Sequence, residues 1–217
     1  DDMNTTSKRV LAGSTAVALT AAMGVGALGA TSAQAAQGNK SLVKVLTSDK
    51  NKWDKNGKDY DVVTEAAIAV LSAKPNSPVK VLTQGKTRVT AFIPTDRAFK
   101  KLASALTGKT VKTELRAFEV VAGLGIDTVE TVLLYHVVPG ATITAKKALK
   151  ADGAKLTTAQ GGTLKVLVKG KKTHTPTIEL RDKDPDFPNA KVVQPDINKG
   201  NKQIAHGING VLLPANL

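Results

Sequence analysis

The chain has 217 residues, a formal net charge of +13, no cysteine and only 3% aromatic residues. The absence of cysteine excludes disulfides, thiol chemistry, cysteine-based zinc sites and attachment of a lipid to cysteine. A chain of this length can fold around a hydrophobic core without such links. With so few aromatic residues, Val, Leu, Ile and Ala must form most of that core.

The first 35 residues have the pattern of a secretory signal. Lys8 and Arg9 form a short basic region, residues 10–30 carry no charge, and Ala33 and Ala35 form a small-residue cleavage site. We therefore expect cleavage after Ala35, and the style of the signal indicates a bacterial protein. The alternative is a retained membrane anchor, because the apolar run is long enough to span a bilayer.

The rest of the chain has no second apolar run of that length, so the product is expected to be secreted, extracellular or held at a cell surface. Met3 is expected to be the natural start, with Asp1–Asp2 a cloning remnant or a mis-set start. The segment removed holds two acidic and two basic residues, so the net charge stays at +13.

Residues 36–58 are expected to be a polar N-terminal extension, with an apolar patch at 42–46, before a single domain over 59–217. Apolar residues at helical spacing predict helices over 61–75, 95–106, 111–122 and 126–138. Alternating or short apolar runs predict strands over 88–93, 163–169, 175–181, 191–194 and 203–208. Helices come first and hairpin-linked strands second, which predicts an α+β fold.

The segment TAFIPTDRAF, residues 90–99, changes from strand to helix at Pro94. Proline has no N–H and is not expected to continue a sheet ladder. A side-chain oxygen of Thr95 or Asp96 is expected to cap the new helix, which is worth about 1 kcal/mol. Phe92 and Phe99 are expected to pack against each other, so this corner is interpreted as a structural device.

Three segments resemble the hallmark segments of fasciclin-type domains, in the right order: TAFIPTDRAF (90–99), LLYHVVPG (133–140) and QIAHGINGVLLP (203–214). The resemblance implies a β-sandwich or wedge with helices packed against it. It also implies a secreted or cell-surface module for adhesion and matrix or biofilm contact, without catalysis. Two positions depart from the pattern, Asn209 where Asp is common and Gln203 where Gly is common, and only small changes in packing or turns are expected there.

The resemblance also supplies contact candidates. The Tyr135-His136 pair is associated with adhesion in the family, and we expect one side chain to pack and its neighbour to face outward. Residues 194–198 are similar to an Asp-Ile segment implicated in integrin contact in animal members, which makes Pro195, Asp196 and Ile197 candidates. A bacterial chain has no natural integrin partner, and the alternative is a loop with a local turn bond from Asp196.

The histidines do not indicate a catalytic or metal site. His136 and His206 lie on apolar faces and are expected to be buried and hydrogen-bonded, while His174 lies in a basic turn and is expected to be solvated. There is no histidine cluster at zinc spacing, no G-x-S-x-G motif, no evident pair of glycosidase carboxylates and no phosphate-binding glycine loop. We therefore expect neither an enzyme nor a cofactor.

Two acidic stretches raise the question of calcium. One contains Asp49, Asn51, Asp54, Asn56, Asp59 and Asp61, and the other contains Asp182, Asp184 and Asp186. Neither has the glycine and glutamate positions of an EF-hand loop. The expectation is a solvated loop, with Asp61 as the cap of the helix over 61–75, and no bound metal.

Residues 141–175 contain eight lysines and a single acidic residue, Asp152. Such a surface would attract acidic polysaccharide, extracellular DNA or anionic cell wall. The candidates for polyanion binding are Lys146, Lys147, Lys165, Lys169, Lys171 and Lys172. Lysine outnumbers arginine and no aromatic residues interleave, so sequence-specific recognition of nucleic acid is not expected. The alternative is a generally basic, soluble surface.

The function that these features predict is a non-catalytic adhesion module that binds a surface or matrix polymer, either an acidic glycan, a cell wall or a matrix protein. One alternative is a small-molecule-binding or enzymatic protein with a pocket near His136, and a closed, apolar environment there would argue against it. A second alternative is a structural component of the cell envelope. The sequence leaves the oligomeric state open.

Overall fold

Two segments that are far apart in the sequence lie side by side at the centre of the sheet. The computed structural model describes residues 36–50, 52–173 and 175–215. Strand β1 (Val89–Pro94) pairs in parallel with β7 (Gln203–Ile208) along their whole length. All residues of both strands are buried, as expected for strands covered on both faces.

The remaining strands extend this pair in both directions, and all other neighbours are antiparallel. In the described residues the sheet has seven strands in the order β2-β1-β7-β6-β5-β4-β3. The other five strands are β2 (Val137–Pro139), β3 (Lys155–Thr157), β4 (Thr163–Lys169), β5 (Thr177–Arg181) and β6 (Ala190–Ile197).

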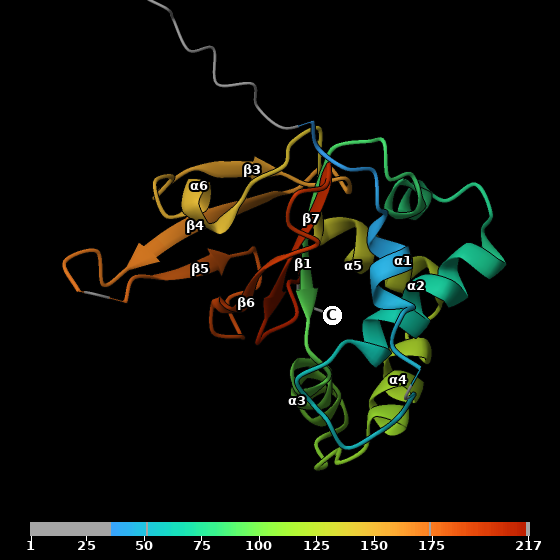
Figure 1. Ribbon diagram of the computed structural model, residues 1–217. Helices are drawn as coiled ribbons and strands as arrows, with labels where there is room; N and C mark the ends of the chain where they lie inside the picture. Colours follow the sequence, from blue (N-terminus) through green and yellow to red (C-terminus); the bar gives the residue numbers. More distant parts are fainter. Residues whose placement is uncertain (1–35, 51, 174, 216–217) are drawn as a thin grey trace, which may run out of the picture. The chain divides into compact units, whose positions relative to one another are not determined.

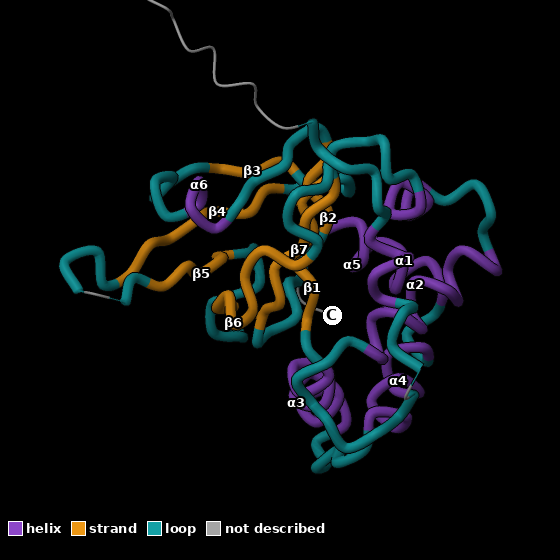
Figure 2. The backbone as a smooth tube through the Cα atoms, in the orientation of Figure 1, coloured by secondary structure: helices purple, strands orange, loops and turns teal. Residues whose placement is uncertain are grey.

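Most helices gather on one side of β1 and β7, whereas β3, β4 and β5 extend to the other side together with the short helix of residues 145–148 (Figure 1). Figure 2 shows the same separation of helix and strand along the backbone. The seven helices of the described residues are α1 (Leu42–Leu46), α2 (Asp61–Ala73), the 3-10 helix η1 (Pro78–Thr83), α3 (Asp96–Thr107), α4 (Glu114–Ala122), α5 (Ile126–Tyr135) and α6 (Ala145–Ala148). The predicted α+β class is confirmed.

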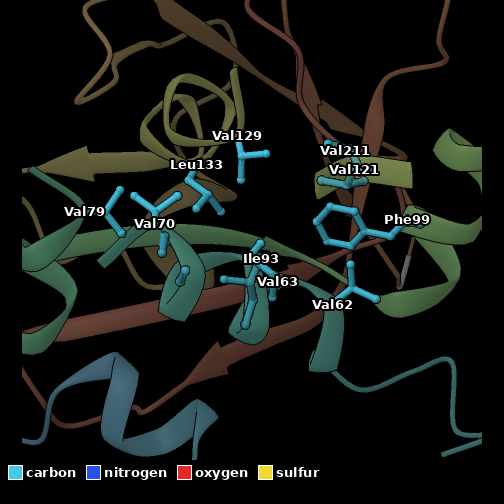
Figure 3. Close-up of a cluster of buried hydrophobic side chains, with 14 of the residues drawn as sticks. Val62, Val63, Val70, Val79, Ile93, Phe99, Val121, Val129, Leu133 and Val211 are labelled. Atoms are coloured by element: carbon cyan, nitrogen blue, oxygen red, sulfur yellow. The ribbon is translucent and has the colours of Figure 1, made fainter. Parts of the chain in front are cut away.

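Two hydrophobic clusters lie on opposite faces of β1. The first, here called the helical core, joins α2, α3, α4 and α5 to alternate residues of β1, and Figure 3 shows Ile93 and Phe99 within it. The second, here called the sheet core, joins Phe92 and Ile208 to Leu164 and Leu180 of β4 and β5. The two halves of the sheet therefore share a core, and register shifts along β6 accompany the bend between them.

The strand-to-helix corner at residues 90–99 caps two helices rather than one. The Thr95 hydroxyl accepts a hydrogen bond from the N–H of Ala98, as expected for the cap of α3. Asp96 instead caps α2, because its carboxylate accepts from the N–H groups of Asp61 (3.1 Å) and Val62 (2.8 Å). The expectation that Asp61 caps α2 is wrong, since Asp61 is the first helical residue and its carboxylate accepts from the N–H of Trp53.

The expected contact between Phe92 and Phe99 is also wrong. Successive side chains of a strand point to opposite faces, so Phe92 enters the sheet core and stacks on His206, with ring centroids 5.7 Å apart. The next residue of β1, Ile93, points to the other face and shares the helical core with Phe99.

Several predicted boundaries shift where strand pairing competes with helical periodicity. The helix predicted over 126–138 ends at Tyr135, because residues 137–139 pair with β1 as strand β2. The strand predicted over 191–194 continues to Ile197. The apolar patch at 42–46 forms α1, and its Leu42 is buried in the helical core.

Gln203 links the first residue of β7 to α1 and η1. Its side chain is fully buried, its Oε1 accepts from the N–H of Leu42 (2.8 Å), and its Nε2 donates to the carbonyls of Val81 (2.7 Å) and Gln84 (3.0 Å). Gln203 therefore does more than the small change in packing that we expected. The other departure, Asn209, has a turn role, because its Oδ1 accepts from the N–H of Lys191.

Replacing Gln203 with leucine should lower the free energy of unfolding by about 2–4 kcal/mol, because Leu42, Val81 and Gln84 would each lose a partner for a covered backbone group. Urea unfolding of the full chain measures this loss. Gln84→Leu is the matched control, since its exposed side chain should change stability by less than about 0.5 kcal/mol. Equal losses from both variants would contradict the structural role of Gln203.

Candidate functional site

A row of basic side chains crosses the outer face of the sheet. In the strand register Lys155 lies opposite Lys165, and Lys165 lies opposite Arg181. All three point away from the sheet core, because their neighbours Leu164 and Leu180 point into it. We call Lys155, Lys165 and Arg181 the cationic row.

The rest of this face adds little negative charge. Lys169 is exposed on the same face of β4, and Lys172 is exposed beyond the end of that strand. Glu179 of β5 lies opposite Lys191 of β6, with Nζ 3.6 Å from Oε1, so this carboxylate already has a cation beside it.

The other candidate lysines lie elsewhere. Lys146 and Lys147 belong to α6, which packs Ala148 into the sheet core and so lies on the opposite side of β4 from the cationic row (Figure 1). Lys171 pairs with Asp152 at 2.6 Å, and this contact lowers the pKa of Asp152.

Sequence reasoning missed Lys155 and Arg181 as candidates. The alternation in TIELR places Arg181 on the outer face of its strand, which is a usable signal. Only the register shows that it lies next to Lys165.

The Tyr135-His136 segment is inside the protein. Tyr135 is fully buried and its Oη donates to the carbonyl of Thr163 (2.9 Å). His136 is 4% exposed. The expectation that one of the pair faces outward is wrong. Helix α5 ends at Tyr135 and the chain then enters the sheet, so Tyr135 packs in the sheet core and His136 lies beside residues of the helical core.

Both ring nitrogens of His136 are used. Nδ1 donates to the carbonyl of Val132 (2.7 Å), so Nε2 is the acceptor for the N–H of Leu212 (2.9 Å). Burial lowers the pKa of His136 to about 4, although the bond to Val132 opposes this effect. The ring is therefore neutral at physiological pH and has no free nitrogen for catalysis.

The cavity beside His136 is small and apolar. It has a volume of about 20 Å³ and is lined by residues such as Phe99, Leu102, Leu133 and Val211. A single water requires roughly 10–15 Å³. This cavity therefore has no room for a small-molecule ligand, and the alternative of a binding pocket near His136 is not supported.

The Asp-Ile segment is mostly held by internal contacts. Asp196 has a φ of 58°, its Oδ1 accepts from the N–H of Ala145 (2.7 Å), and its own N–H donates to Nδ1 of His206 (3.2 Å). Ile197 packs against the helical core. Of the three candidates in this segment, only Pro195 is exposed.

The prediction for His206 is confirmed, because it is 1% exposed and its Nε2 donates to the carbonyl of Ile143 (2.8 Å). The prediction of a buried, hydrogen-bonded His136 is confirmed as well. His174 lies outside the described residues, as does the signal-like segment 1–35.

The two acidic stretches differ in the structure. In the second stretch Asp182 accepts from the N–H of Leu213, and Asp184 accepts from the N–H of Asp186, so these are local structural bonds. In the first stretch Asp59 and Asp61 are buried, and the expectation of a solvated loop is wrong for them. Their carboxylates lie with that of Asp96, where three ligand oxygens could hold a metal ion.

The sequence model of the fasciclin domain family matches residues 64–214, which is well over half of the chain. The chain belongs to the fasciclin family. Domains of this family are associated with cell adhesion, are generally non-catalytic and are typically extracellular.

This fasciclin domain is similar in fold to a solved FAS1 domain pair from the insect cell adhesion molecule Fasciclin I, with 17% sequence identity and a TM-score of 0.44. The match covers 70% of this chain and 43% of the insect chain. No curated protein matches the chain. Among the described residues, no helix combines the length and the apolar character needed to cross a bilayer.

The buried histidine makes the stability of this fasciclin domain depend on pH. In the unfolded chain His136 binds a proton below a pKa of 6.5, whereas the folded protein excludes that proton until about pH 4. The contribution of His136 is therefore complete above pH 6.5 and is lost as pH falls toward 4. Its size is about 3 kcal/mol.

We expect His136→Gln to be less stable than the wild type at pH 7.5, with a difference that shrinks steadily between pH 6.5 and 4.5. Urea unfolding at several pH values measures this difference. His206, whose pKa burial also lowers, is present in both proteins and cancels. A difference that does not change with pH would show that His136 is not held neutral.

Proposed function

We propose that this fasciclin domain is a secreted, non-catalytic adhesion module that binds an anionic surface or matrix polymer through the outer face of β3, β4 and β5. The observation that carries the proposal is the cationic row, in which Lys155, Lys165 and Arg181 occupy directly opposite positions on three neighbouring strands. The polymer is an acidic glycan, an anionic cell-wall polymer or an acidic matrix protein.

The stability of the sheet does not account for this row. Like charges directly opposite each other destabilise a sheet, whereas opposite charges contribute roughly 0.2–1 kcal/mol per pair. Neighbouring strands lie about 4.8 Å apart. The row therefore presents three cations at a short, regular spacing, which suits a polymer that carries a carboxylate, sulfate or phosphate on each repeat.

The chemistry of the row favours recognition of charge rather than of base sequence. Two of its three members are lysines, which act as point charges. No aromatic residue of β3, β4 or β5 is available for stacking on a base. Binding should therefore depend strongly on salt and little on the sequence of a nucleic acid.

The location outside the cell rests on separate support. The signal-like pattern of residues 1–35 fits with the typical extracellular location of the family. The chain expressed with this segment should be recovered from the medium with Ala36 as its first residue. N-terminal sequencing measures this, and recovery in the membrane fraction with the segment attached would contradict secretion.

The binding proposal is tested by retention on heparin and on double-stranded DNA during a salt gradient. The triple variant Lys155→Gln, Lys165→Gln and Arg181→Gln should elute at a clearly lower salt concentration. On DNA the slope of log affinity against log salt should fall by about 2–3.

The matched control carries Lys146→Gln, Lys147→Gln and Lys150→Gln, which remove the same charge around α6. This control should retain most of its binding. An equal loss in both triple variants would indicate a generally basic surface rather than a site. No retention of the wild type at low salt would contradict the binding proposal and favour the alternative of a structural component.

A further inference from the structure

Five carboxylates meet where three helices begin. Asp61, Asp96 and Glu114 lie in the first turns of α2, α3 and α4, and the loop before α2 adds Asp54 and Asp59. Ligand oxygens of Asp59, Asp61 and Asp96 lie within 4.8 Å of one another, as do those of Asp54, Asp59 and Glu114. Asp59 belongs to both groups, so we call the five residues the acidic cluster.

Two members of the acidic cluster are buried without a complete set of partners. Asp59 is 9% exposed, and neither of its carboxylate oxygens accepts a hydrogen bond from an N–H or hydroxyl group of the described residues. Its neighbour at hydrogen-bonding distance is the carboxyl group of Asp96, whose pKa is raised to about 8 by burial and by this contact. Glu114 is 1% exposed, and its Oε2 likewise has no partner there. A buried carboxylate is costly unless a donor, a cation or a metal faces it.

Other carboxylate oxygens of the acidic cluster already have partners. Lys100 lies 2.9 Å from Oε1 of Glu114, and the N–H of Trp53 donates to Asp61. Asp96 accepts from two N–H groups at the start of α2. These donors leave the unsatisfied oxygens on Asp59 and Glu114, at the centre of the acidic cluster.

We propose that the acidic cluster binds a hard divalent cation, calcium, with Asp59 as the shared ligand of both carboxylate groups. All of the side-chain ligand atoms of the acidic cluster are carboxylate oxygens, which suit calcium and do not suit zinc or copper. The ion can enter from solvent, because Asp59 and Asp61 line a surface cavity of about 470 Å³ together with Ser48 and Asn56.

The proposal is independent of polymer binding and concerns how the domain is held together. Residues 57 and 59 already run beside the start of α3, where the carbonyls of Gly57 and Asp59 accept from Arg97 and Asp96. A calcium ion would join this loop to three helices. The positive N-terminal ends of those helices oppose the ion, so we expect the weak affinity of extracellular calcium modules, about 10⁻⁴–10⁻³ M.

Trp53 provides a direct reporter, because it is the one tryptophan of the chain. Its backbone N–H donates to the Asp61 carboxylate, and its ring centroid lies 5.3 Å from that of Phe118. Addition of CaCl₂ to chelator-treated protein should change the Trp53 fluorescence along a one-site curve. The midpoint of thermal unfolding should rise with calcium concentration over the same range.

Asp59→Asn is the decisive variant, because it keeps the shape of the side chain and removes its charge. It should weaken calcium binding by more than about tenfold, and it should be at least as stable as the wild type without calcium. Glu114→Gln should act in the same direction and provides a second measurement. Asp186→Asn is the matched control in the other acidic stretch, and its calcium response should equal that of the wild type.

Three outcomes would overturn the proposal. The first is no fluorescence or thermal response up to about 10 mM CaCl₂, well above the expected affinity range. The second is an equal response in Asp59→Asn and the wild type. The third is a Trp53 signal that responds to pH and not to calcium, which would show that a proton on Asp96, whose pKa is raised by burial and by its contact with Asp59, balances the acidic cluster instead of a metal ion.

Discussion

The parallel pairing of β1 with β7 is the constraint on which the rest of the structure depends. It is the only parallel pairing between two strands of the described residues, and it brings β7 against the strand that precedes α3. Because both strands are buried on both faces, every polar group on them needs an internal partner. Gln203 and His206 meet this requirement by bonding to α1, η1 and the segment before α6.

The elements whose periodicity agrees with their surroundings could be predicted from the sequence. The strands over 163–169 and 203–208 have the predicted bounds, because their patterns have no helical alternative. The prediction failed at Val137, where a helical pattern continues but pairing with β1 satisfies the backbone instead. It also failed for the predicted contact between Phe92 and Phe99. The sequence does not show that β1 separates two cores, and these two side chains lie in different ones.

The candidate site was harder to predict, because a site depends on which strands and helices become neighbours. Lys165 and Lys169 share a face by the simple alternation of the strand, which the sequence pattern alone is enough to predict. The partnership of Lys165 with Lys155 and Arg181 depends on register. The burial of Asp59 depends on the packing of α3 and α4, which supply Asp96 and Glu114 from distant parts of the sequence.

The charges buried inside the domain help to explain the charge of its surface. The charged side chains that the described structure buries are all carboxylates, namely Asp59, Asp61, Asp96, Glu114, Glu179 and Asp184. The lysines and arginines remain at least partly exposed, so the surface is more basic than the net charge of +13 suggests. A long-range field depends on the charges near solvent, and buried acids paired with a cation contribute little to it. A cation in the acidic cluster would therefore stabilise the helices and, at the same time, leave the cationic row with few acids competing for it.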